Sequence, residues 1–543
     1  MAFAKPEFRS PKAESRTKAE IRGPNPEIVA GGEFSGWPNR NPFGFRTSDL
    51  VRISDFGFRA KRALLTALFV WLVVCASHAA TPSRPNIVLI LLDNVGQEWF
   101  GCYGSEEKCT PNIDRLAQTG VRFEHCYTPP VCGPSRIVLL TGRYLLRSGF
   151  TLHHDAALYS GGGLDPKRET VFARPFRDAG YATGIVGKWQ INNLYDEPGV
   201  LKRHGFDEQL VWPGSIDSNR VGAAGMEKFR ALVRAEAHEE LAVFNRNIES
   251  RYWDPVLIRN GRRETHAGKF GPDVMQSFAL DFLERHRGGP FLLYYPMVLT
   301  HGQSFVQPVV PTPLNLDTNR SHHEMFADML RYADKLVGDL VRKLDELNLR
   351  DNTLIFIASD NGTEKEMAAR RNGREVRGGL YTLTEAGGDV VLLANCPRLI
   401  PGGRTVPLAD FSDVLPTMCD FAGIALPKER VFDGRSHAPV LRGELGAKPA
   451  REWIFNQYAA TRVMRDQRFK LYSDGRFFDA NADPEEQRNL AASTEPQLSA
   501  ARERLGKTLQ SLPPDAAPPF LLRSLSGFKL RAEQRAQPPK PTR

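Results

Sequence analysis

Residues 86–94 read Asn-Ile-Val-Leu-Ile-Leu-Leu-Asp-Asn, and this stretch predicts the architecture of the chain. Its apolar run with β-branched residues is typical of a strand buried on both faces of a parallel sheet. The run ends in the polar pair Asp93-Asn94. Residues 353–362 repeat the arrangement, with a second apolar run that ends in Asp360-Asn361. Because open α/β sheets bind ligands at the carboxyl ends of their strands, we expect the two pairs to meet there.

These two polar pairs offer only oxygen ligands to a metal ion. Carboxylate and amide oxygens suit a hard divalent cation, so we expect Ca²⁺, with Mg²⁺ as the alternative. Each Asp-Asn pair taken alone is equally compatible with ordinary turn chemistry after a strand. Two pairs at two strand ends, beside the cysteine motif described below, favour the metal site.

Two segments carry the apolar stripe of an amphipathic helix, residues 273–285 and residues 322–349. The stripe of the longer segment is formed by Met329, Ala333, Leu336, Leu340 and Leu344. Further buried strands are expected at residues 181–186 and 291–295. Strands that alternate with such helices predict a doubly wound α/β domain.

Residues 131–136, Val-Cys-Gly-Pro-Ser-Arg, form the most informative motif of the chain. Pro134 suits the first turn of a helix, and the apolar run at residues 137–140 follows it. Cys132 is therefore expected at a helix N-terminus, where free N–H groups and the helix dipole favour an anion. Taken alone, the motif is also compatible with a buried cysteine ahead of a helix.

The motif resembles that of the sulfatase family, in which the cysteine is oxidised to formylglycine, an aldehyde residue. The resemblance implies that a separate maturation enzyme converts Cys132. One hydroxyl of the hydrated aldehyde then attacks the sulfur of a sulfate ester, and the second collapses to the aldehyde and expels sulfate. Arg136 is implied to hold the formylglycine and the oxygens on the metal side. The implied metal ligands are Asp93, Asn94, Asp360, Asn361 and Cys132.

Two further segments match this family. Residues 187–190, Gly-Lys-Trp-Gln, resemble its Gly-Lys-Trp-His, which makes Lys188 a sulfate clamp and Gln190 a substrate contact. Gln190 can donate a hydrogen bond but cannot deliver a proton at neutral pH. His301 matches the second active-site histidine of the family, and it becomes the candidate to protonate the leaving alcohol.

Two more positions depart from the family pattern. The family has a second aspartate where this chain has Asn94, so we expect a weaker metal site. Residues 377–388 resemble a late segment in which a lysine clamps the sulfate, and that lysine falls on Leu380. Arg377 or Arg374 is expected to supply the missing cation, and we assign Arg377 to substrate binding.

The resemblance extends over about residues 85–495. It implies an alkaline-phosphatase-like, doubly wound mixed sheet with a smaller C-terminal α+β subdomain that contains an antiparallel sheet. The expected segments are a basic Pro/Gly-rich tail at 1–58, a signal peptide at 59–79, the catalytic domain at 80–425, the subdomain at 426–512 and a Pro/Arg-rich tail at 513–543.

The apolar run at residues 63–76 follows basic residues and precedes Ser-His-Ala, a pattern typical of a secretory signal peptide. The run is too short for a transmembrane helix, so we expect a periplasmic or secreted protein without stable membrane insertion. A signal peptide does not normally follow a tail such as residues 1–58, which suggests that synthesis starts near Leu50 or Val51. Residues 1–79 hold 12 Lys+Arg and 7 Asp+Glu, so the rest of the chain carries only +4 of the net charge of +9, which gives no case for a nucleic-acid partner.

Other residues leave alternatives open. Among the cysteines, Cys102 and Cys109 would close the shortest disulfide loop in an exported protein. His153 and His154 lie in the glycine-rich residues 151–163 and belong either to a substrate pocket or to a solvated loop.

The leading hypothesis is an exported sulfatase that hydrolyses a sulfate monoester of a small molecule or glycan, with a carbohydrate as the expected substrate. The second hypothesis is a phosphodiesterase or phosphonate monoester hydrolase with the same nucleophile, motivated by Gln190 and Leu380. The third is a relative that binds sulfated glycan without turnover.

Overall fold

A computed structural model describes residues 84–159, 162–235, 242–302, 310–311 and 320–520. Residues 1–80 and 81–543 form separate units, and every described residue belongs to the second. The expected tail at residues 1–58 and the expected signal peptide at residues 59–79 lie outside the described residues. In the described part, no helix has the length and apolar character needed to cross a membrane.

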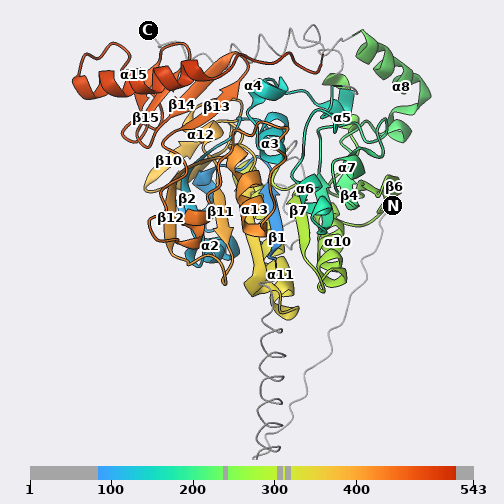
Figure 1. Ribbon diagram of the computed structural model, residues 1–543. Coiled ribbons are helices and arrows are strands. Elements are labelled where there is room, and N and C mark those ends of the chain that lie inside the picture. The colour runs from blue at the N-terminus through green and yellow to red at the C-terminus, as the bar shows by residue number, and fades with distance from the viewer. Residues whose placement is uncertain (1–83, 160–161, 236–241, 303–309, 312–319, 521–543) are drawn as a thin grey trace, which may run out of the picture. The chain divides into compact units, whose positions relative to one another are not determined.

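A ten-stranded mixed sheet lies at the centre of the second unit (Figure 1). Its strand β1 (Asn86–Leu92) pairs in parallel with β7 (Phe291–Pro296) and with β8 (Thr353–Ser359). All three strands are buried along their whole length, which confirms the predicted buried strands. The strand order is β12-β2-β11-β8-β1-β7-β3-β4-β5-β6. The remaining strands are β2 (Val121–Tyr127), β3 (Ala182–Lys188), β4 (Glu208–Trp212), β5 (Val256–Arg259), β6 (Arg262–Thr265), β11 (Leu392–Asn395) and β12 (Arg404–Asp410).

Helices cover both faces of this sheet, so the predicted doubly wound fold is confirmed. Alternate residues of β1 enter two different hydrophobic cores, as the side-chain directions of a strand require. One core includes α2 (Pro111–Gln118), α10 (Gly271–Arg285) and α11 (His322–Glu346). The other includes α3 (Cys132–Thr141), α6 (Ala173–Asp178), α7 (Val200–Arg203) and α13 (Val414–Ala422).

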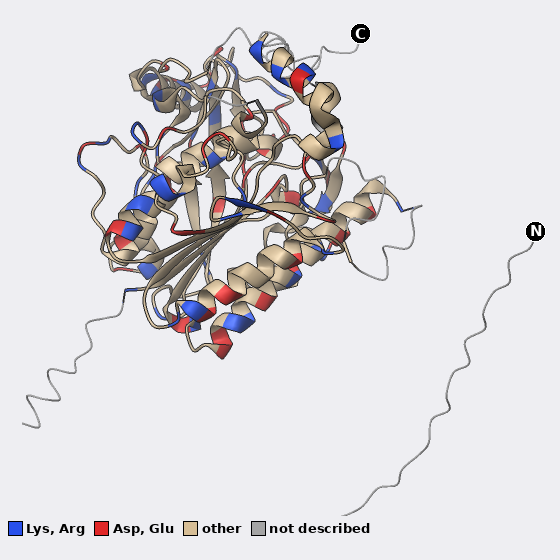
Figure 2. Ribbon diagram, turned by 90° about the vertical axis from the view of Figure 1, so that its right-hand side faces the viewer, with Lys and Arg blue, Asp and Glu red and all other residues tan. Residues whose placement is uncertain are grey.

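The long helix α11 has the predicted amphipathic stripe, whose five residues are all buried. A capping box starts it, because the Ser321 side chain accepts from the Glu324 N–H while the Glu324 side chain accepts from the Ser321 N–H. Basic and acidic residues are interspersed along the helices rather than gathered by sign (Figure 2).

A separate four-stranded antiparallel sheet lies near the C-terminus, as expected. Its strands follow the order β13 (Ile454–Tyr458), β14 (Thr461–Arg465), β15 (Phe469–Tyr472) and β16 (Phe477–Asp479). Helix α15 (Pro496–Ser511) packs on this sheet through Ala501, Leu505 and Leu509. Figure 1 shows α15 lying beside β14 and β15.

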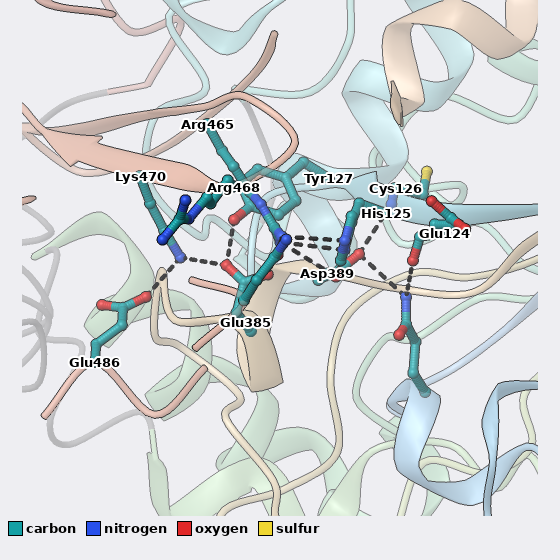
Figure 3. A network of polar contacts seen from close by, with 12 residues as sticks. Glu124, His125, Cys126, Tyr127, Glu385, Asp389, Arg465, Arg468, Lys470 and Glu486 are labelled. Atoms are coloured by element: carbon teal, nitrogen blue, oxygen red, sulfur yellow. Dashed lines mark hydrogen bonds and ion pairs between the residues drawn. The ribbon is translucent and has the colours of Figure 1, made fainter. Parts of the chain in front are cut away.

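A buried ion-pair network joins this small sheet to α12 (Glu385–Gly388) and β2 (Figure 3). Glu385 accepts from Arg465 and from Tyr127, and it pairs with Lys470 at 2.9 Å. The Arg465 guanidinium also contacts His125 and Asp389, so it already neutralises a group of side chains that could otherwise attract a metal ion. The network therefore holds in place the segment that follows Leu380.

The first part of the predicted C-terminal tail is packed against the domain. The Ala516 N–H donates to the Leu146 carbonyl at 2.6 Å, and Phe520 stacks on His154 with ring centroids 4.6 Å apart. The six described cysteines are all free thiols, so the Cys102–Cys109 pairing that the sequence left open is not formed. The other elements are η1 (Gln97–Trp99), η2 (Gly101–Tyr103), α4 (Leu145–Ser148), α5 (Ala156–Tyr159), α8 (Ser218–Arg234), η3 (Ala242–Asn247), η5 (Arg350–Asn352), β9 (Ala368–Arg371), β10 (Arg374–Arg377), η6 (Phe411–Asp413) and α14 (Ala438–Arg442).

Candidate active site

The two Asp-Asn pairs lie next to each other at the carboxyl ends of β1 and β8. The parallel register sets Leu92 opposite Ser359, so the residues that follow emerge at one edge. The Asn94 N–H donates to Asp360 Oδ1 at 3.0 Å, and Asn361 Nδ2 donates to Asn94 Oδ1 at 2.8 Å. The structure therefore brings together the four residues that the sequence predicted to meet.

Cys132 is the first residue of α3, and its side chain lies beside the carboxylates of Asp93 and Asp360. Val131 before it is extended, and Cys132 is buried with 6% of its surface exposed. The Ser135 hydroxyl donates to the Asp360 carbonyl and so ties the first turn of α3 to the end of β8. Single ligand atoms of Asp93, Cys132 and Asp360 all lie within 4.8 Å of one another.

Two buried cations neutralise these carboxylates. Arg136 donates from Nε and Nη2 to Asp360 Oδ2 at 3.1 and 2.7 Å, and from Nη1 to the Lys188 carbonyl at 3.1 Å. Lys188 Nζ lies 2.7 Å from Asp93 Oδ2. The side chains of all four residues are at most 1% exposed, so these ion pairs act in a medium of low polarity.

A glycine places Lys188. Gly187 has φ +123°, and a Cβ there would lie 1.9 Å from the Pro296 carbonyl oxygen of the neighbouring strand β7. Only glycine fits both the backbone conformation and the space. The close approach of β3 and β7 therefore depends on Gly187, and the next residue is carried into the site.

The two carboxylates have opposite pKa shifts. Burial favours a higher pKa for Asp93, but the charges of Lys188 and Arg136 outweigh it and hold that pKa well below its usual range. Burial, together with the negative charge of Asp93, raises the pKa of Asp360 to about 7. A divalent cation bound between the carboxylates would relieve their repulsion.

Two oxygens of this cluster are buried without a hydrogen-bond donor, Asp93 Oδ1 and Asn361 Oδ1. Buried polar atoms normally have a partner, and carboxylate and amide oxygens are the ligands that Ca²⁺ prefers. The donor set therefore fits the expected cation.

His301 follows β7 and is held by a residue that the sequence did not reveal. Arg251 Nη2 lies 3.1 Å from His301 Nδ1, and the Tyr252 hydroxyl donates to the His301 carbonyl at 2.8 Å. Burial, and next the positive charge of Arg251, lower the pKa of His301 well below its ordinary value. The ring is therefore neutral at physiological pH.

Gln190 contacts Asp155, because its Nε2 donates to Asp155 Oδ2 at 3.2 Å. Its Oε1 is buried without a partner, and its backbone has φ +63°. His153 lies beside Gly133, where a Cβ would be 3.3 Å from His153 Nδ1. This contact favours the pocket interpretation of His153 over the solvated loop.

Arg377 does not join the buried cluster. It lies on β10, its side chain is 65% exposed, and it pairs with Glu375 at 3.2 Å. Leu380 does lie beside the site, because its N–H donates to the Thr363 carbonyl at 3.0 Å and the next N–H, of Tyr381, donates to the Pro130 carbonyl at 2.9 Å. The position that lacks the lysine is thus next to both the strand end and the start of α3.

Sequence reasoning missed two charged residues near the site. Arg251 comes from an irregular stretch with no periodic signal. Glu364 follows the Asp360-Asn361 pair closely and could have been noticed as an acid after a strand. Burial is the larger cause, and the negative charge of Glu366 the second, that raises the pKa of Glu364 to about 7. A hydrogen bond from the Asn94 side chain has the opposite effect and lowers this pKa.

Comparisons with known proteins agree with this geometry. A family model described as Sulfatase matches residues 85–424. Arylsulfatase D of Homo sapiens is 30% identical over 456 residues, which cover 73% of this chain and 75% of the relative. The N-acetylgalactosamine-6-sulfatase of Canis lupus familiaris is 32% identical over 384 residues, 68% of this chain and 69% of the relative. The crystal structure of Ps i-CgsB has a TM-score of 0.65 at 23% identity and covers 83% of this chain and 98% of that chain.

Proposed function

The chain belongs to the sulfatase family, the sulfuric ester hydrolases, and from this premise we propose that it hydrolyses a sulfate monoester of a sugar. We further propose that a formylglycine made from Cys132 is the nucleophile and that Ca²⁺ assists it. The observation that carries the proposal is the convergence of Cys132, Asp93 and Asp360 at one strand edge.

Asp93, Asn94, Asp360 and Asn361 would hold the cation, together with the oxygen that replaces the sulfur of Cys132. Support comes from the two oxygens without donors and from the raised pKa of Asp360. When bound, the cation would stabilise negative charge on the sulfate oxygens. Asn94 brings one negative charge fewer than an aspartate, so the affinity of the site for the ion should be lower.

The surroundings of residue 132 suit an anionic group. The first turn of α3 presents free N–H groups and the positive end of the helix dipole. Lys188 adds a cation held 2.7 Å from Asp93, within reach of the same place. Formylglycine supplies a nucleophilic hydroxyl and a second hydroxyl for sulfate release, which a thiol lacks. Arg136 keeps Asp360 oriented through two N–H groups, as a planar guanidinium can.

His301 would act as a hydrogen-bond donor to the departing oxygen. Its Nδ1 faces an arginine N–H, so the ring proton is placed on Nε2. This refines the expectation of proton delivery: the neutral ring donates a hydrogen bond where negative charge develops and does not act as an imidazolium.

The sugar is proposed from the relatives. The N-acetylgalactosamine-6-sulfatase of Canis lupus familiaris, 32% identical, is named for a sulfated sugar. The proposed maturation enzyme and the proposed periplasmic or secreted location follow from the cysteine motif and from residues 59–79. A glycan outside the cytoplasm would be accessible to such an enzyme.

The test compares turnover of two chromogenic esters by protein matured together with a formylglycine-generating enzyme. We expect faster hydrolysis of 4-nitrophenyl sulfate than of bis(4-nitrophenyl) phosphate, and no activity from C132A. Sulfated monosaccharides then identify the sugar. Faster hydrolysis of the phosphodiester would favour the phosphodiesterase function, which the absent cation at Leu380 and the glutamine at position 190 make the second candidate.

A further inference from the structure

Arg251 differs from the other deeply buried arginines of the described residues. Four arginines there are at most 8% exposed, and three of them form ion pairs with carboxylates. Arg136 pairs with Asp360, Arg451 with Asp413 and Arg465 with Glu385. No described carboxylate forms such a pair with Arg251; the charge of Arg251 acts on the pKa of Glu364, but from beyond ion-pair distance. A buried charge without a close counter-ion is unfavourable, so Arg251 needs another explanation.

The side chain of Arg251 is held by aromatic rings. Its guanidinium carbon lies 4.7 Å from the centroid of the Trp212 ring and 5.6 Å from that of Tyr252. Stacking of this kind offsets part of the desolvation cost and fixes the plane of the guanidinium. It does not use the N–H groups, which point out from the edge of that plane.

The one hydrogen-bond contact of the guanidinium within the described residues is with His301. Because Nδ1 of the ring accepts from Arg251 Nη2, the ring keeps its proton on Nε2. The Arg251–His301 pair therefore presents N–H donors and one full positive charge. The charges of Asp93 and Lys188 also act on His301, but these two groups form their own ion pair at 2.7 Å. The Arg251–His301 pair therefore keeps N–H donors without a paired acid, and such donors form a site for an oxyanion.

We propose that Arg251 binds an oxyanion of the substrate beside His301 and supplies the cation that is absent at Leu380. The anion is either the sulfate of the scissile ester or a second acidic group on the same substrate, since both offer the same oxygen acceptors. This inference rests on the proposed function for its substrate, but the binding of an anion is measurable without turnover.

The first experiment measures binding of inorganic sulfate by calorimetry in the presence of Ca²⁺. The proteins are wild type, R251Q, R251K and the matched control R234Q, whose arginine is 64% exposed and pairs with Glu227 on α8. We expect sulfate binding to weaken about ten-fold or more in R251Q, because a charge-assisted contact is lost. R251K keeps the charge but loses the planar guanidinium that stacks on Trp212, so its sulfate binding should lie between those of wild type and R251Q.

The second experiment separates the two anion sources by the KM of two substrates. One is 4-nitrophenyl sulfate, whose only anion is the ester, and the other is a disaccharide with one sulfate ester and one carboxylate. A raised KM for both substrates in R251Q, with weaker sulfate binding, identifies the scissile sulfate. A raised KM for the disaccharide alone identifies the second acidic group.

The proposal is overturned if R251Q matches R234Q in sulfate binding and in both KM values. Unfolding midpoints in sulfate-free buffer show whether R251Q is folded. If it is not, R251K takes its place: a KM raised above that of wild type supports the proposal, and KM values equal to those of wild type for both substrates overturn it. A protein that binds sulfate through Arg251 but turns over neither ester would contradict the proposed function and leave this inference standing.

Discussion

Replacing Lys188 by methionine tests whether the site is an ion-pair cluster poised for a metal ion. Lys188 and Asp93 form a pair 2.7 Å apart whose side chains are 1% and 0% exposed. Removing one partner of a buried pair costs about 3–5 kcal/mol, because the other charge stays buried. Arg136 Nη2 remains 3.6 Å from Asp93, so we expect the lower end, about 3 kcal/mol, in metal-free protein.

The matched control is K335M. Lys335 pairs with Asp339 at 2.9 Å on α11, but its side chain is 59% exposed. Such surface pairs contribute about 0–1 kcal/mol, so the two variants differ in burial far more than in pair geometry. The assay is equilibrium urea unfolding at pH 7.5 in the presence of a chelator.

Repeating the unfolding assay with added calcium tests a second point, the position of the bound ion. If the ion binds Asp93, it replaces the lost ammonium, and the gap between K188M and wild type narrows as calcium is added. Equal losses of stability in K188M and K335M without metal would refute the buried-pair reasoning. A gap that calcium leaves unchanged would refute the placement of the cation beside Asp93.

Three further variants test other parts of the site and fold. G187A should lose at least about 2 kcal/mol, because φ +123° and a Cβ 1.9 Å from the Pro296 carbonyl both oppose a side chain; an unchanged urea midpoint would contradict this. Burial lowers the pKa of His204 from 6.5 to about 4. As the pH falls below 6.5, the unfolded chain binds a proton at this histidine and the folded protein does not, so the folded state loses stability relative to the unfolded state. The advantage of wild type over H204Q should therefore shrink by about 3 kcal/mol from pH 7.5 to pH 4, and parallel pH curves for the two proteins would show otherwise. R136K keeps a charge but lacks the planar guanidinium that serves Asp360 and the Lys188 carbonyl together, so kcat/KM should fall about 100-fold, and a loss under three-fold would refute that role.

Local sequence patterns predicted the doubly wound core and the meeting of the two Asp-Asn pairs, while the antiparallel C-terminal sheet and the roles of Arg136 and Lys188 came from the resemblance to the sulfatase family. The apolar runs before Asp93 and Asp360 marked two strands, and strand ends in a parallel sheet share an edge, so the meeting of both pairs could be inferred without coordinates. The same holds for Cys132, because Pro134 and the apolar run after it indicated a helix start. For these residues, the sequence directly around them is enough to predict the strand or helix end at which they lie.

Residues placed by tertiary packing were not predictable in this way. Arg251 reaches His301 from an irregular stretch, held there by contacts with Trp212 and Tyr252 that no local period encodes. Arg377 was expected to supply a cation because it is close in sequence to Leu380, but the β9–β10 hairpin keeps it exposed and paired with Glu375. Closeness in the sequence did not predict which of these two arginines lies at the site, because the loops that carry them determine where their side chains lie.

The Cys102–Cys109 pairing, which the sequence left open, is not formed for a related reason. The short sequence separation suggested a small loop, but the residues between them fold into a compact turn anchored elsewhere. The Cys102 N–H donates to Asp114 Oδ1 at 2.8 Å, and the Cys109 thiol donates to the Glu107 carbonyl at 3.3 Å. The Cys109 thiol therefore has its own acceptor, the Cys102 thiol interacts with the Asp114 carboxylate, and burial raises the pKa of each thiol.

The central claim is that Cys132 is converted to formylglycine and that this residue performs the hydrolysis. The most direct measurement is the mass of the tryptic peptide that carries Cys132, taken from a preparation whose turnover of 4-nitrophenyl sulfate has been measured. The claim predicts an aldehyde in place of the thiol, reactive with a hydrazide, in a fraction that rises with specific activity across preparations. Full activity in a preparation whose Cys132 is entirely a thiol would contradict it.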